Sequence, residues 1–252
     1  MSDGSTGGRR PTKAERKEQA RLEREELQRK AAKRTRMRAL GVGLVAAALA
    51  LAVALAVVLQ PDDVDLPDRQ ELLAQADQAA ERAECTPIDN VGPYQPEDAD
   101  SAHIGTETGP AEMPALSTYP SIPPTSGPHA PVTQGAGVND TAPPIDQVIH
   151  SLEHGSVVIW FDPNAGGEEL QKIKDYYADE DHVIVAPYDY PDAGEAGSLP
   201  PGVQMSIVAW HFQQECADPS LAVTAAFVDA YRFSADAQER YEGEAPEPGA
   251  AI

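Results

Sequence analysis

The sequence is poor in positive charge over most of its length. Residues 60–252 contain 6 Lys and Arg against 35 Asp and Glu, whereas residues 1–38 contain 13 Lys and Arg against 6 Asp and Glu. An asymmetry of this kind between the two ends of a chain is first a signal of topology. The basic end has no aromatic residue and no nucleic-acid-binding motif. We therefore expect no nucleic-acid partner.

Several motifs that identify common activities are absent. The chain has no P-loop, no GxGxxG motif and no evident Ser-His-Asp constellation, so it gives no support to the usual nucleotide-binding and hydrolase classes. It has only two cysteines, Cys85 and Cys216, and no CxxC spacing. We predict a disulfide, which closes a loop of about 130 residues and contributes about 4–5 kcal/mol in the chain-entropy model. The alternative is a pair of thiolate metal ligands.

One long segment has no charge at all. Residues 39–59 read ALGVGLVAAALALAVALAVVL, which as a helix spans roughly 31 Å, close to the thickness of a bilayer core. The segment is longer than the apolar part of a signal peptide, and 38 residues precede it, so we predict an uncleaved signal-anchor. The flanking charges predict a cytoplasmic N-terminus and an extracytoplasmic C-terminal part. The expected location is the cell membrane, with the chain as a single-pass integral protein.

The remaining segments follow from composition and periodicity. Residues 1–38 are expected to form a basic, partly helical cytoplasmic tail, residues 60–84 an acidic stem, and residues 241–252 a disordered tail. Residues 85–240 are expected to form the extracytoplasmic domain, which begins with a long irregular arm rich in proline and glycine. Periodic segments then predict an α+β or α/β fold with about three to four strands and two to three helices. The expected helices are 145–154, 168–177 and 221–233, and the expected strands are 156–161, 182–188 and 203–212.

The histidines are the candidate functional residues. His150 and His154 lie four apart on a predicted helix, opposite its apolar stripe, where two imidazoles can share a metal ion. His129 ends the stiff segment PPTSGPH, and His103 lies upstream of it. These four residues are predicted to form a copper or zinc site. The alternative is that the helix pair is solvated and that His129 only stabilises a turn. His182 and His211 are interpreted as structural.

A second interpretation of the same helix is catalytic. HSLEH matches H-x-x-E-H, a zinc peptidase signature in which Glu153 would act as the general base. Gly155 ends the predicted helix immediately after the motif, and the motif usually lies in the middle of a helix in a larger domain. We therefore keep the peptidase as a minor alternative.

Four segments carry a family resemblance. These are PPTSGPH (123–129), HSLEHGSVVIWF (150–161), VIVAPY (183–188) and AFVDAYR (226–232), and the AW pair within Val208–Trp210 adds to them. With them, the chain from His103 to about Glu247 resembles the bacterial family known as domain of unknown function 3105. The resemblance implies a membrane-anchored or exported protein and draws attention to the two histidine-bearing segments, but it implies no reaction.

Taken together, the sequence favours an extracytoplasmic domain that binds copper or zinc, with a binding role preferred to an enzymatic one. The alternatives are a ligand-free interaction module that contacts other cell-envelope proteins, and the zinc metallopeptidase.

Overall fold

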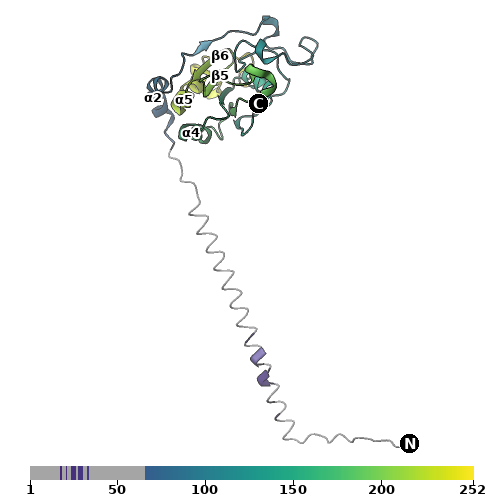
Figure 1. Ribbon diagram of the computed structural model, residues 1–252, viewed down its shortest axis with the longest axis vertical. Coiled ribbons are helices and arrows are strands. Elements are labelled where there is room, and N and C mark those ends of the chain that lie inside the picture. The colour runs from purple at the N-terminus through teal and green to yellow at the C-terminus, as the bar shows by residue number, and fades with distance from the viewer. Residues whose placement is uncertain (1–17, 19–20, 22–23, 27, 31–32, 34–65) are drawn as a thin grey trace, which may run out of the picture. The chain divides into compact units, whose positions relative to one another are not determined.

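The computed structural model describes residues 66–252, together with residues 18, 21, 24–26, 28–30 and 33 (Figure 1). The chain divides into two units, Met1–Asp63 and Val64–Ile252. In the first unit the described residues are helical and exposed, with ion pairs one turn apart such as Lys30–Glu26. The second unit is the α/β domain.

The predicted transmembrane helix, residues 39–59, lies outside the described residues. Within the ranges that the structure does describe, none of the helices combines the length and the apolar character needed to cross a bilayer. The prediction of a single-pass membrane anchor is therefore not supported. The cell-membrane location that was deduced from it is withdrawn as well.

The domain is built on one mixed sheet with the strand order β1-β6-β5-β3-β4-β2. β3 pairs parallel with β4 and antiparallel with β5, β4 pairs parallel with β2, and β6 pairs antiparallel with β5 and β1. The strands are β1 (Asp89–Asn90), β2 (Gly137–Val138), β3 (Val157–Phe161), β4 (Val183–Pro187), β5 (Met205–Ala209) and β6 (Phe212–Cys216).

The sheet has six strands and the described part of the domain has four α-helices, so the predictions of three to four strands and of two to three helices were both wrong. Two of the additional strands, β1 and β2, lie in the irregular arm and are only two residues long. Strands this short show no alternating pattern of apolar residues, so the sequence did not reveal them. The third arises because the segment expected as one strand over 203–212 ends early. The chain reverses after Ala209 through His211, whose φ is 67°, and returns as β6.

Three helices cover one face of the sheet: α2 (Arg69–Arg82), α4 (Glu168–Tyr176) and α5 (Leu221–Tyr231). Figure 1 shows α2 and α4 close to α5, and both helices contact it. Alternate residues of β3 point into this core, as expected for a strand that is buried on both faces. α2 contributes Leu72 and Ala79 to the core, so this helix is part of the domain rather than a separate stem. The predicted disulfide is present and joins Cys85, just after α2, to Cys216 at the end of β6.

The opposite face is covered by α3 (Ile145–Glu153) and the irregular arm. The apolar stripe of α3 packs on Val158 and Trp160 of β3, as its periodicity predicted. The arm contains only short 3-10 turns, η1 (Glu97–Ala99) and η2 (Leu116–Thr118), and two more follow later, η3 (Pro191–Gly197) and η4 (Ala235–Arg240). The segment PPTSGPH belongs to this arm and is buried throughout.

The end of the chain is not a disordered tail, in contrast to the prediction for residues 241–252. The amide of Glu247 donates to the Glu153 carbonyl at 3.1 Å, and the amide of Gly249 donates to the His154 carbonyl at 2.9 Å. These bonds occupy carbonyl groups at the C-terminal end of α3, which have no partner within the helix. The prediction failed because the segment binds through its backbone, and its composition does not reveal that.

Candidate metal centre

Two coil segments meet in a single backbone bridge, which places two histidines side by side. His103 and His129 are paired in a parallel bridge. The amide of Ile104 donates to the His129 carbonyl at 2.7 Å, and the amide of His129 donates to the Ala102 carbonyl at 3.0 Å. Paired residues of neighbouring strands project to the same face. The two imidazole rings accordingly lie with their centroids 4.9 Å apart.

Packing around the preceding glycine fixes the position of His129. Gly127 has a φ of 121°, and a Cβ atom there would lie within 2.9 Å of the rings of Tyr119 and Tyr94. The hydroxyl of Tyr119 donates to the Pro128 carbonyl at 2.6 Å. The amide of Gly127 donates to the Asp100 carbonyl at 2.9 Å. The segment is therefore clamped between two tyrosines and the arm, and His129 is completely buried.

The last turn of α3 supplies the other two members of the cluster, His150 and Glu153. Residues three apart on a helix share a face. The Oε2 atom of Glu153 lies 3.0 Å from Nε2 of His129, 3.7 Å from Nε2 of His103 and 3.9 Å from Nε2 of His150. One potential ligand atom from each of the four residues lies within 4.8 Å of all the others. Glu153 is only 3% exposed, whereas the His103 side chain is 36% exposed.

The hydrogen bonds of His129 determine which of its ring nitrogens is protonated. The other nitrogen, which points into the cluster, has a free lone pair in the neutral ring. Nδ1 lies 2.7 Å from the Gly127 carbonyl oxygen, which accepts only, so Nδ1 carries a proton and donates it. In the neutral ring, Nε2 is then an unprotonated acceptor 3.0 Å from the Glu153 carboxylate. Two acceptors at this distance require a proton or a cation between them. The carbonyl contact is also the kind of outer hydrogen bond that orients a metal-binding imidazole.

Burial and neighbouring charges keep the cluster in a form that can bind a metal. Burial, together with the neighbouring His129 and His154, lowers the pKa of His150 to about 4, so this imidazole is neutral near pH 7. Burial alone would raise the pKa of Glu153, but the hydrogen bond from His129 and the positive charge that His129 carries when protonated outweigh burial and lower the pKa. Neutral imidazole and ionised carboxylate are the forms that coordinate metals.

His154, which was predicted as a ligand, does not join the cluster. Its Nδ1–H donates to the Ala251 carbonyl at 2.9 Å, and its Nε2 lies 3.6 Å from the Glu247 carboxylate. The arrangement expected for an H-x-x-E-H peptidase, with both histidines as ligands and the glutamate free, is therefore not assembled. Glu153 takes the place in the cluster that was predicted for His154. The sequence had indicated Glu153 only as a candidate general base. The spacing of three from His150 was the available signal for Glu153.

The two remaining histidines make structural contacts. His182 lies 3.1 Å from the Ala250 carbonyl through Nε2. His211 bridges two carboxylates, with Nε2 2.8 Å from Asp100 and Nδ1 2.9 Å from Glu244. Both histidines were interpreted as structural, and these partners agree with that interpretation.

The fold and the cluster define a class: an α/β domain with a mixed sheet and a group of three histidines and one glutamate that could hold a metal ion. The chain belongs to the family described as "Protein of unknown function (DUF3105)", whose match covers residues 112–248 and confirms the resemblance. The matched range includes His129, His150 and Glu153, whereas His103 precedes it. No curated protein and no solved structure matches this chain.

Proposed function

We propose that this domain binds one divalent transition-metal ion, zinc or copper, through His103, His129, His150 and Glu153. The observation that carries the proposal is the contact between the His129 Nε2 lone pair and the buried Glu153 carboxylate at 3.0 Å. A cation at that position would satisfy both groups. The Nε2 atom of His103 supports the same conclusion, because it is buried and has no hydrogen-bond partner among the described residues.

The spacing of the donor atoms is close to that of a coordination sphere. With zinc–nitrogen and zinc–oxygen bonds of about 2.0–2.2 Å, neighbouring ligand atoms of a tetrahedral site lie about 3.3–3.5 Å apart. The three distances from the Glu153 Oε2 atom, 3.0, 3.7 and 3.9 Å, lie on both sides of that range. The other pairs of donor atoms lie within 4.8 Å of one another, so side-chain rotations that draw the imidazoles together would form the sphere.

The chemistry of the donors selects the type of metal. Three imidazoles and one carboxylate suit Zn²⁺ and Cu²⁺ better than Ca²⁺ or Mg²⁺, which prefer oxygen ligands. Thiolate does not contribute, because both cysteines are in the disulfide. Zinc and copper were also the two metals predicted from the histidines.

The burial of the ligands supports a binding role. His129, His150 and Glu153 are buried, whereas the half-exposed His103 lies at the rim. A sphere completed by four protein ligands is typical of a site that holds its metal, since catalytic zinc usually keeps a position open for water. His103 is the ligand most accessible to an incoming or departing ion.

Metal content and affinity test this function directly. We expect the full-length chain, purified without chelator, to contain about one zinc or copper ion per chain by elemental analysis. His129→Ala and Glu153→Gln should each weaken the affinity at least 100-fold in competition titrations. With the free ion at slightly more than 100 times its Kd, the bound metal should stabilise the folded domain by about 3 kcal/mol. Removal of the metal should lower the free energy of unfolding by that amount.

The matched control is His154→Ala. This residue is a helix neighbour of the cluster, and its ring centroid lies 4.5 Å from that of His150, but its nitrogens contact the end of the chain. Its removal should leave metal affinity within about threefold. Equal losses for His150→Ala and His154→Ala would contradict the assigned ligand set. A native chain that is free of metal and does not bind zinc or copper in titration would favour the ligand-free interaction module.

A further inference from the structure

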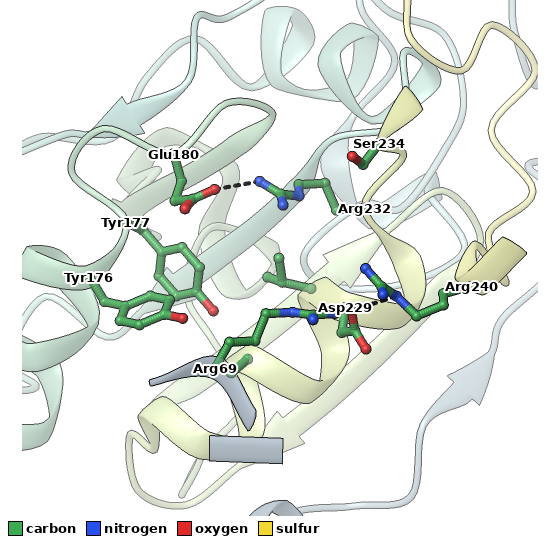
Figure 2. A pocket seen from close by; sticks show the side chains of 10 residues that line it. Arg69, Tyr176, Tyr177, Glu180, Asp229, Arg232, Ser234 and Arg240 are labelled. Atoms are coloured by element: carbon green, nitrogen blue, oxygen red, sulfur yellow. Dashed lines mark hydrogen bonds and ion pairs between the residues drawn. The ribbon is translucent and has the colours of Figure 1, made fainter. Parts of the chain in front are cut away.

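A second group of charged side chains lies away from the metal centre, where the helices on the other face of the sheet meet η4. Arg69 of α2, Arg232 just after α5, and Arg240 of η4 line one small pocket (Figure 2). The carboxylates of Asp229 and Glu180 also line it, together with Tyr176, Tyr177 and Ser234. The cavity has a volume of about 80 Å³.

The three arginines are not balanced by the acids in the pocket. Arg69 and Arg240 both pair with the single carboxylate of Asp229, the second at 3.3 Å. Arg232 pairs with Glu180 at 2.6 Å, as the dashed line in Figure 2 shows. The lining therefore carries three guanidinium groups and two carboxylates, which leaves one positive charge in excess.

This excess is unusual for the domain. Residues 60–252 contain only 6 Lys and Arg against 35 Asp and Glu, and three of those six cations line this pocket. Partial burial, together with the charges of Arg240 and Arg232, lowers the pKa of Arg69. Cations that repel one another in this way are stabilised when an anion binds between them.

A buried donor adds to the evidence. Tyr177 is 1% exposed, and among the described residues its hydroxyl has only the side chain of Thr224 as a hydrogen-bond partner. Buried polar groups normally have hydrogen-bond partners. In Figure 2 the rings of Tyr177 and Tyr176 lie beside Arg69. A bound oxyanion would supply an acceptor on this side of the pocket.

We propose that this pocket binds a small oxyanion of the size of inorganic phosphate, held by Arg240, Arg69 and Arg232. Guanidinium groups match phosphate oxygens with paired hydrogen bonds, which a point charge such as lysine does not provide. The cavity volume of about 80 Å³ is small, so the pocket suits a single phosphate group rather than a nucleotide.

Calorimetric titration of the full-length chain with inorganic phosphate, and in parallel with acetate, tests this site. The informative variant is Arg240→Gln, because Arg240 is half exposed and its loss leaves Arg69 paired with Asp229. We expect phosphate to bind and Arg240→Gln to raise the Kd tenfold or more. The matched control is Arg82→Gln, at the other end of α2 and outside the pocket, which should change the Kd less than twofold.

Three results would overturn the proposal: no phosphate binding by the native chain, binding of acetate without phosphate, or an equal effect of Arg240→Gln and Arg82→Gln. Circular dichroism should show that both variants are folded, so that a difference in Kd reflects the pocket and not a loss of structure. The outcome is also independent of the metal centre, because no residue is shared by the two sites.

Discussion

On one face of the sheet, α2, α4 and α5 cover the strands with regular helices, and the core consists almost entirely of aliphatic and aromatic side chains. On the other face, a single helix and a long, mostly irregular arm cover the same strands. Both faces are buried, because alternate residues of β3 are inaccessible on each side. The two coverings differ in what else they bury.

Most of the buried polar residues lie on the irregular face. Thr125, Ser126 and His129 belong to the arm, and His150, Ser151 and Glu153 belong to α3. Buried polar groups need partners, and the arm can provide them, because its backbone amides and carbonyls are not all used by a helix or a sheet. The comparison shows how one sheet can combine a simple apolar core with a site made of charged and polar side chains.

The largest expected effect tests the helical face, through the disulfide that joins the end of α2 to β6. Replacing Cys85 and Cys216 with serine should lower the free energy of unfolding by up to about 4–5 kcal/mol, because a closed loop of 131 residues is released in the unfolded chain. Urea unfolding of the variant and of the reduced native chain measures this, and the two should agree. A loss below about 1 kcal/mol would show that the helical face is maintained by packing alone.

A smaller effect is expected on the irregular face, at Gly127. An alanine there must adopt a φ of 121° and would bring its Cβ within 2.9 Å of two tyrosine rings, so Gly127→Ala should lower stability by about 2 kcal/mol. It should also weaken metal binding, because His129 is displaced. Gly135→Ala on the same arm is the control, since its Cβ would have no neighbour within 4 Å. Equal unfolding energies for the two variants would contradict the clamp around Gly127.

The smallest effect concerns His211, which joins the arm to the end of the chain. Burial alone would lower its pKa, but hydrogen bonds to Asp100 and Glu244 raise it above the usual 6.5. The protonated form is therefore favoured in the folded state. Its contribution is complete below about pH 6.5 and is lost as the pH rises through the folded-state pKa.

His211→Gln should remove about 1 kcal/mol of stability at pH 5.5 and much less at pH 8.5, as measured by urea unfolding at both values. His182→Gln is a suitable control, because His182 also lies in a left-handed backbone conformation. A loss at His211 that does not depend on pH would exclude the ionic contribution.

The regular elements could be predicted from the sequence because they leave a periodic pattern. The apolar spacing of Ile145, Val148, Ile149 and Leu152 identified α3, and runs of β-branched residues identified β3 and β4. The reversal between β5 and β6 left no such sign, because it contains Trp210 and His211 rather than glycine or asparagine. Contacts with the distant arm stabilise that turn.

The candidate site was predicted only in part. His103, His129 and His150 were expected together and do lie together. His154 was predicted as a ligand, but Glu153 occupies that place in the cluster. The prediction failed because helix spacing alone does not determine the direction of a side chain at the end of a helix. Here the end of the chain hydrogen-bonds to His154 from one side. That contact spans almost one hundred residues of sequence and leaves no local pattern.

The position of the last residues has a practical consequence. The Ala251 carbonyl accepts a hydrogen bond from His154, whose ring lies beside that of His150, so a peptide fused after Ile252 would begin next to the proposed metal site. A polyhistidine tag at this end would bring competing imidazoles to the site and would distort measured metal contents. A fluorescent dye attached at the same end would instead report copper loading, because its emission would be quenched when a paramagnetic ion occupies the cluster.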